Sequence, residues 1–250
     1  MNPILSGVGR RLAQFLAKPS RRFAPTIVSG REARWQDYIV PGDVLLVEGN
    51  SRISTAIKYL TQSTWSHAAI CVGDRAAHPL VEADVVTGVS AVPFEKYADS
   101  NVRICRPVGL AREDVDRLLT FVVDRIGSTY DLKNVFDLAR YLFPMPPVPA
   151  RFRRNLITFG SGEPTKAICS SLIAEAFSAV RYPILPDRWL LDGTDAHTRR
   201  LVYLMRHHSS YTPRDFDLSP YFAVIKPTIE HEFDYRRFPW HESRQPAHAA

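Results

Sequence analysis

The run that most constrains the architecture of this chain is KAICSSLIAEAF, residues 166–177, in which Cys169 stands at the start of a helical pattern. The apolar residues that share one side of this helix are Leu172, Ile173, Ala176, Phe177 and Val180. The first turn of a helix presents unpaired N–H groups and a partial positive charge, which favour a thiolate over a thiol. Cys169 is therefore either a nucleophile or, like most cysteines, inert core filler, and a nearby base would distinguish the two.

Length and charge exclude several classes of protein. The chain has 250 residues, of which 45% are hydrophobic, so it can bury a full core. Its net charge is +6, but six basic residues precede the first acid, Glu32, and the remainder carries 26 basic and 26 acidic residues. Because the body is balanced and shows no zinc-finger spacing or recognition signature, we predict no nucleic-acid partner.

The cysteines and the hydropathy indicate a compartment. Cys71, Cys105 and Cys169 are an odd number of widely spread residues, which argues against a disulfide framework and favours a reducing environment. No stretch approaches the roughly 18 to 20 apolar residues of a membrane span, and the N-terminus lacks an apolar segment followed by a cleavage site. We predict free thiols and a cytoplasmic location, with peripheral contact to a membrane as the alternative.

Residues 1–30 are predicted to be a basic amphipathic N-terminal arm. On a helix, its apolar residues fall on one side, and these are Ile4, Leu5, Val8, Leu12, Phe15 and Leu16. Residues 1–25 could lie on an anionic membrane surface as a peripheral contact. They could equally dock on their own domain or on a partner subunit, and an Arg-rich start without acids also resembles an organelle transit peptide.

From Val40 the chain changes to short apolar runs separated by turns, which is typical of strands. We expect strands at 43–48, 68–72, 80–83, 88–92, 102–105 and 221–225. Ser51 is expected to cap a short helix between the first two strands. This pattern predicts an α+β fold, with a small antiparallel sheet or partial barrel packed against a helical layer.

Helical spacing dominates the later part of the chain. We expect helices at 112–126, capped by Gly127, and at 131–142, 169–180 and 198–208. Five prolines make 144–164 a long loop, either a lid or binding loop or a disordered segment. The domain is thus expected over 31–230, between the arm at 1–30 and a mobile tail at 231–250.

Five short motifs follow one another in a fixed order. They are Pro41-Gly42-Asp43-Val44, Ser66-His67-Ala68-Ala69-Ile70, Val81-Glu82-Ala83, Gly127-Ser128-Thr129-Tyr130-Asp131 and Cys169-Ser170-Ser171-Leu172. Together they resemble the circularly permuted branch of the NlpC superfamily, in particular the YiiX-like (YebB-like) group of papain-like cysteine hydrolases. The order supports this, because the histidine here precedes the cysteine, as in the lecithin:retinol acyltransferase relatives, whereas unpermuted members have the cysteine first. The resemblance implies a permuted papain-like (NlpC-type) fold.

The resemblance implies three catalytic residues: Cys169 as nucleophile, His67 as general base and Glu82 as the group that orients the imidazole. The chemistry requires such a trio, since a thiolate attacks the acyl carbon, an imidazole carries the proton, and a polar group fixes the imidazole tautomer. Each residue also has a structural interpretation: Cys169 as core filler, His67 as a strand-edge histidine and Glu82 as a salt-bridged carboxylate. Asp84, on the same strand face as Glu82, is an alternative orienting group.

Two further residues are assigned to substrate or oxyanion contacts. Tyr130 resembles a tyrosine near the active site of the superfamily, and Ser170 follows the nucleophile. Tyr130 could also be a structural tyrosine, and the backbone N–H of Cys169 is the other expected oxyanion donor. We interpret Cys71 and Cys105 as core residues.

No cofactor and no metal are predicted. Adjacent residues His207 and His208 invite a metal interpretation, but neighbours on a helix point apart and no third ligand has the right spacing.

The sequence therefore predicts a cysteine hydrolase that cleaves a peptide or N-acyl amide bond through a covalent thioester. The substrate is either cell-wall-peptide-like or acyl-lipid-like. One alternative is a thiol acyltransferase or phospholipase that acts on lipids at a membrane surface, and a second is a catalytically inactive binding module.

Overall fold

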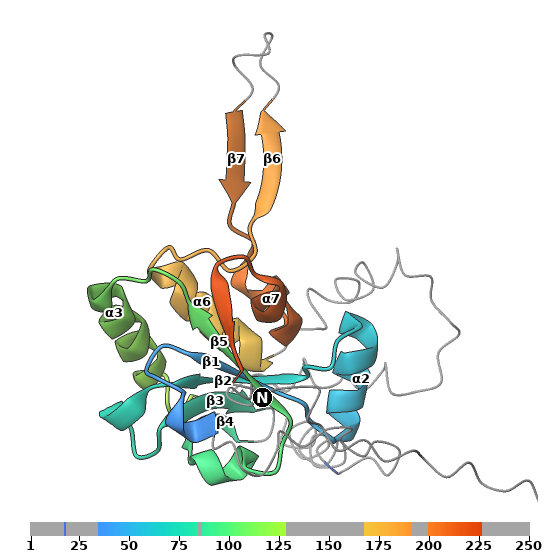
Figure 1. Cartoon of the computed structure of the whole chain (residues 1–250), viewed down its shortest axis with the longest axis vertical. Coiled ribbons are helices and arrows are strands. Elements are labelled where there is room, and N and C mark those ends of the chain that lie inside the picture. Colours follow the sequence, from blue (N-terminus) through green and yellow to red (C-terminus); the bar gives the residue numbers. More distant parts are fainter. Residues whose placement is uncertain (1–17, 19–34, 85–86, 129–167, 192–199, 227–250) are drawn as a thin grey trace, which may run out of the picture.

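The computed structural model describes residues 18, 35–84, 87–128, 168–191 and 200–226 of the chain. In this part of the chain, six short strands form one antiparallel sheet with the order β4-β3-β2-β1-β5-β8 (Figure 1). The strands are β1 (Val44–Val47), β2 (His67–Cys71), β3 (Leu80–Asp84), β4 (Gly88–Val92), β5 (Val102–Pro107) and β8 (Phe222–Ile225). A separate hairpin of β6 (Asp187–Leu191) and β7 (Arg200–Leu204) projects from the body.

Helices connect the strands and cover the sheet. The α-helices in the described ranges are α2 (Arg52–Thr61), α3 (Arg112–Val123), α6 (Ile168–Ala179) and α7 (Pro213–Leu218). The short 3-10 turns are η1 (Trp35–Asp37), η2 (Gly73–Arg75), η3 (Phe94–Tyr97) and η4 (His208–Ser210). This arrangement confirms the predicted α+β class, with an antiparallel sheet packed against helices.

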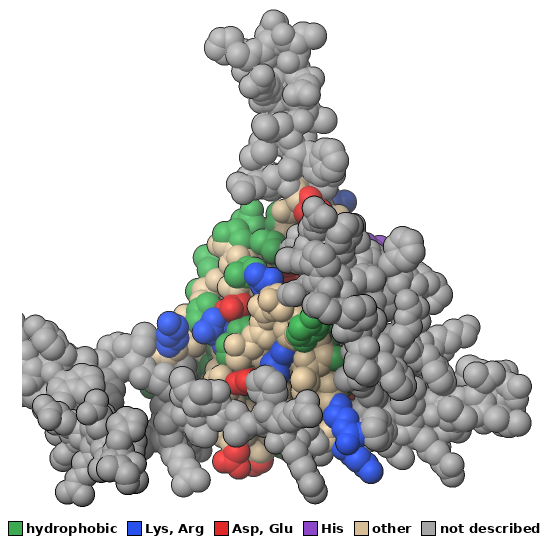
Figure 2. Space-filling view, turned by 90° about the vertical axis from the view of Figure 1, so that its right-hand side faces the viewer, with side chains coloured by type: hydrophobic (Ala, Val, Ile, Leu, Met, Phe, Trp, Pro, Cys, Tyr) green, Lys and Arg blue, Asp and Glu red, His purple; other side chains and the backbone are tan. Residues whose placement is uncertain are grey.

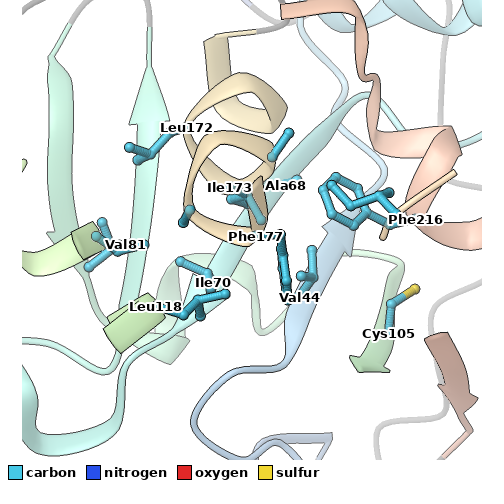
Figure 3. Close-up of a cluster of buried hydrophobic side chains, with 14 of the residues drawn as sticks. Val44, Ala68, Ile70, Val81, Cys105, Leu118, Leu172, Ile173, Phe177 and Phe216 are labelled. Atoms are coloured by element: carbon cyan, nitrogen blue, oxygen red, sulfur yellow. The ribbon is translucent and has the colours of Figure 1, made fainter. Parts of the chain in front are cut away.

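The sheet is buried on both faces. Alternate residues of a strand point to opposite faces, and in β1 all four positions are buried, which explains why its sequence VLLV is apolar throughout. One face packs against α3, α6 and α7. Figure 3 shows Leu172, Ile173 and Phe177 of α6 in the same buried cluster as Ala68 and Ile70 of β2. The other face, which includes Leu45 and Val47, packs against the segments of η1 and η3.

Local signals place several elements as the sequence predicts. Ser51 caps α2, because its hydroxyl accepts a hydrogen bond from the Ser54 N–H at 3.1 Å. Helix α3 ends at Val123 and not at 126, since the chain turns there and reaches Gly127 at a φ of 88°. The Gly127 N–H donates to the carbonyl of Val89, which ties this turn to β4.

The predicted helix at 198–208 is wrong. Residues Arg200–Leu204 form β7, which pairs with β6, and the 3-10 turn η4 follows at His208–Ser210. The short apolar run LVYL fits either period, and its β-branched valine and aromatic tyrosine favour a strand once a partner strand is available. Strand β6 had no counterpart in the sequence predictions.

Other predicted segments lie outside the described residues. These are the helix at 131–142, the loop at 144–164, the tail at 231–250 and the arm at 1–30 apart from Lys18. The Lys18 carbonyl accepts a hydrogen bond from the Arg52 N–H at 3.2 Å, so this one residue lies at the start of α2.

The described part of the chain contains no long apolar helix, and its surface carries charges of both signs. No helix in the described ranges has the length and hydropathy to cross a membrane. On the face shown in Figure 2, basic and acidic side chains of the described residues lie interspersed with apolar ones. This agrees with the balanced charge of the sequence after its first 31 residues.

Candidate active site

His67 and Glu82 meet across two neighbouring strands. His67 is the first residue of β2, and Glu82 in β3 lies opposite Ala69, two residues further along β2. Because side chains two residues apart share a face, His67 and Glu82 are diagonal neighbours on one side of the sheet. The His67 Nε2 and Glu82 Oε2 atoms are 3.0 Å apart.

Cys169 completes the group from the other end of the domain. It is the second residue of α6, its side chain is 5% exposed, and its thiol is hydrogen-bonded to the His67 imidazole. With Nε2 directed at Glu82, Nδ1 is the ring nitrogen left for the sulfur. The structure thus brings together all three side chains that the sequence singled out for catalysis, and it puts the imidazole between the other two.

The electrostatics of the group favour an ion pair. Burial by itself would lower the pKa of His67, but the charge and hydrogen bond of Cys169, followed by those of Glu82, raise it to about 10. Burial would likewise raise the pKa of Glu82, but its hydrogen bond and charge interaction with His67 prevail, helped by Lys96 and Tyr97, and lower it to about 2. At neutral pH the site therefore holds an imidazolium beside an ionised carboxylate.

Two residues that sequence reasoning missed also contact Glu82. Both belong to η3: the Lys96 ammonium donates to Oε1, and the Tyr97 hydroxyl donates to Oε2. A buried carboxylate requires hydrogen-bond donors, so the presence of some donors to Glu82 is expected. Their location, in a 3-10 turn after β4, carries no sequence motif that would identify them.

The remaining predicted residues are engaged elsewhere or lie outside the description. The Asp84 Oδ1 atom accepts a hydrogen bond from the Thr87 N–H at 3.3 Å, in the turn between β3 and β4. Ser170 is fully buried, and its hydroxyl donates to the Tyr211 carbonyl at 2.8 Å. Tyr130 lies outside the described residues.

The other two cysteines occupy the core, as the sequence indicated. Cys71 and Cys105 are buried, and all three cysteines are free thiols. Burial is the main cause that raises the pKa of Cys71 to about 11 and that of Cys105 to about 12. Neither is therefore a thiolate at neutral pH.

The adjacent histidines lie at the start of η4. The His207 Nδ1 atom is 2.6 Å from the Ser209 hydroxyl and also accepts from the Ser209 N–H. Within the described ranges, no three histidine, cysteine or acidic side chains group as metal ligands.

The fold and the order of these residues define a class of protein. A strand histidine that precedes a helix cysteine in the chain, on an antiparallel sheet covered by helices, is the arrangement of permuted papain-like enzymes. The sequence model of one family, described as the permuted papain-like amidase enzyme, YaeF/YiiX, C92 family, matches residues 38–143. Over these residues the chain is similar to that family of papain-like amidases, in agreement with the resemblance that its motifs carry. The matched segment includes His67 and Glu82 and ends before Cys169.

A solved structure is also similar to this chain. It is the crystal structure of the metalloprotein YiiX from Escherichia coli O157:H7, with 17% sequence identity and a TM-score of 0.45. The similarity covers 74% of this chain and 95% of that chain. A comparison with curated protein sequences gave no significant match.

Proposed function

We propose that this protein hydrolyses a peptide or N-acyl amide bond, with Cys169 as nucleophile, His67 as acid and base, and Glu82 as the group that orients the imidazole. The observation that carries the proposal is the hydrogen-bonded series of these three side chains, with His67 Nε2 held by the carboxylate at 3.0 Å. A buried cysteine without such a base would be core filler, as Cys71 and Cys105 are.

The proposed reaction has two stages. The Cys169 sulfur, after transferring its proton to His67, attacks the amide carbon, and the backbone N–H of Cys169 stabilises the negative oxygen. The carbon–nitrogen bond then breaks as the imidazolium gives its proton to the leaving amine, which leaves an acyl group on sulfur as a thioester. A water molecule, deprotonated by the imidazole, attacks the thioester, and the thiolate leaves as the acid product forms.

The proposed substrates are of two kinds, a cell-wall-like peptide or an N-acylated, lipid-like amide. The similarity of residues 38–143 to an amidase family supports the amide bond in both. The basic amphipathic pattern of residues 1–25 supports a lipid-like substrate at an anionic surface.

The test uses purified wild type and the variant Cys169→Ala. Each is incubated with muropeptides, N-acyl amino acids and phospholipids, and products are identified by mass spectrometry. We expect a cysteine-dependent product with a free amine from one of the two amide classes. The variant Cys105→Ala, which removes a buried thiol away from the site, is the matched control and should retain turnover. Products from phospholipids alone, or none from any class, would contradict the proposal.

A further inference from the structure

Glu82 carries more hydrogen bonds than the orientation of one imidazole requires. Its side chain is 1% exposed, and three donors converge on it: His67 and Tyr97 on Oε2, and Lys96 on Oε1. A carboxylate that is free to rotate would present either oxygen to the imidazole, or neither. With a donor fixed on each oxygen, the plane of this carboxylate is determined.

Tyr97 is the rigid member of this set. It is 6% exposed and packs in the core layer that also contains Leu45, Ala69 and Leu80, so its ring cannot move far. The centroids of the Tyr97 and His67 rings are 6.1 Å apart. Burial, and then the charge of Glu82, raise the pKa of Tyr97, so its hydroxyl is protonated and can donate at neutral pH.

Lys96 is the more exposed member of this set. Its side chain is 42% exposed, so its ammonium reaches Oε1 from the solvent side while the Tyr97 hydroxyl reaches Oε2 from within the protein. A half-exposed lysine loses side-chain entropy when it is fixed and is screened by salt, so it holds the carboxylate more weakly than a buried hydroxyl does.

We propose that Tyr97 is a positioning residue, whose hydroxyl holds the Glu82 carboxylate in the rotamer that directs Oε2 at His67 and leaves Nδ1 for Cys169. The inference rests on the proposed function of the Cys169, His67 and Glu82 group. The Tyr97 hydroxyl donates to Glu82 and acts on His67 through that carboxylate.

The test is the variant Tyr97→Phe, which retains the ring and removes the hydroxyl. The His67 resonance is assigned by its loss in His67→Ala, and its titration is followed by NMR. We expect the pKa of His67 to fall by about one unit in Tyr97→Phe, because the released carboxylate no longer holds the imidazolium in a fixed geometry. The control is Tyr59→Phe, at a 52% exposed tyrosine on α2, which should titrate as wild type does. An unchanged or raised pKa in Tyr97→Phe would overturn the inference.

Failure of this inference is distinguishable from failure of the proposed function, because the titration needs no turnover. If wild type hydrolyses an amide and Tyr97→Phe leaves the titration unchanged, the function stands and the positioning role falls. If no substrate is cleaved but the titration shifts, the positioning role stands and the function falls. If Tyr97→Phe does not fold, the NMR resonance of the Tyr97 hydroxyl proton is followed in the wild-type protein instead. It should exchange slowly with water and shift in Glu82→Gln, and an unshifted resonance would overturn the inference.

Discussion

The buried carboxylate of Glu82, in β3, accepts hydrogen bonds from a histidine, a lysine and a tyrosine. An ionised carboxylate is very costly to bury alone, and these donors replace the water that it loses. The carboxylate in turn favours the charged form of His67. The charge states of the two residues are therefore coupled, and a change at one is measurable at the other.

The first prediction follows from this coupling. Replacing Glu82→Gln removes a negative partner of His67 while it retains the shape of the side chain, so the pKa of His67 should fall by about one unit or more. An NMR titration of the His67 ring checks this. The control is Asp84→Asn, at the other acidic residue on the strand, whose Oδ1 accepts from the Thr87 N–H. If Asp84→Asn lowers the pKa of His67 more than Glu82→Gln does, Asp84 is the orienting group.

The same shifts give a pH dependence of stability. The pKa of His67 is raised from 6.5 to about 10, so its stabilising contribution is complete below pH 6.5 and is lost as the pH rises through 10. The pKa of Glu82 is lowered from 4.5 to about 2, so its contribution is complete above pH 4.5 and is lost as the pH falls toward 2. Urea unfolding at several pH values should thus show the largest difference between wild type and Glu82→Gln from pH 4.5 to 6.5. A difference that grows between pH 7 and 10 would contradict these shifts.

The turn after β1 constrains where β2 begins. The Gly49 N–H donates to the Ser66 hydroxyl at 2.9 Å, and Ser66 immediately precedes His67. A Cβ atom on Gly49 would lie 2.2 Å from the Ser54 Oγ and 3.0 Å from the Ser66 Oγ. This close approach of backbone to side chains requires a glycine.

Gly49→Ala should therefore disturb both stability and the site. We expect a loss of about 1 to 3 kcal/mol in the free energy of unfolding, measured in urea, because buried neighbours must move to make room. The His67 resonance should shift as well. Gly109→Ala is the control: nothing lies within 4 Å of its Cβ, but its φ of 70° strains an alanine, so it should cost about 1 kcal/mol without moving the His67 resonance. Wild-type stability in Gly49→Ala would show that the packing relaxes freely.

Elements with a local signal were predictable from the sequence. The strands around Val44–Val47 and Gly88–Val92 have apolar runs bounded by turns, and Ser51 is a standard helix cap. The β6–β7 hairpin was not predictable, because a run such as LVYL fits a helix or a strand and only the pairing of Arg200–Leu204 with Asp187–Leu191 decides.

The candidate site, like the fold, could be predicted from the sequence only in part. The motifs and the family resemblance identified His67, Glu82 and Cys169, and the structure brings these side chains together. Lys96 and Tyr97 were not identified, because their contact with Glu82 depends on how the turn after β4 packs beneath the sheet. The choice between Glu82 and Asp84 also depended on which carboxylate reaches the ring, and this is a property of side-chain geometry.

Helix α6 links the candidate site to the core of the domain. Two turns after Cys169, Phe177 is fully buried, with ring centroids 5.2 Å from Phe222 and 6.3 Å from Phe216. This aromatic group joins α6 to α7 and to the edge strand β8. The position of Cys169 is therefore supported by packing at the far end of its helix.

Phe177→Ala should lower the free energy of unfolding by about 3 to 5 kcal/mol, because it leaves a large cavity among rings that cannot close over it. The measurement is urea or thermal unfolding. Leu218→Ala, at a 52% exposed residue that ends α7, is the control and should change stability by about 0.5 kcal/mol or less. A loss below about 1 kcal/mol in Phe177→Ala would mean that the aromatic group repacks.

The order of the elements along the chain has a consequence for biosynthesis. Strands β1 to β5 and helix α3 are complete by Val123, whereas α6 begins only at Ile168. On the ribosome, the imidazole and its carboxylate therefore emerge well before the sulfur. Any nascent polypeptide halted between these points lacks the attacking atom, so the hydrolase that we propose becomes competent only after α6 has been synthesised.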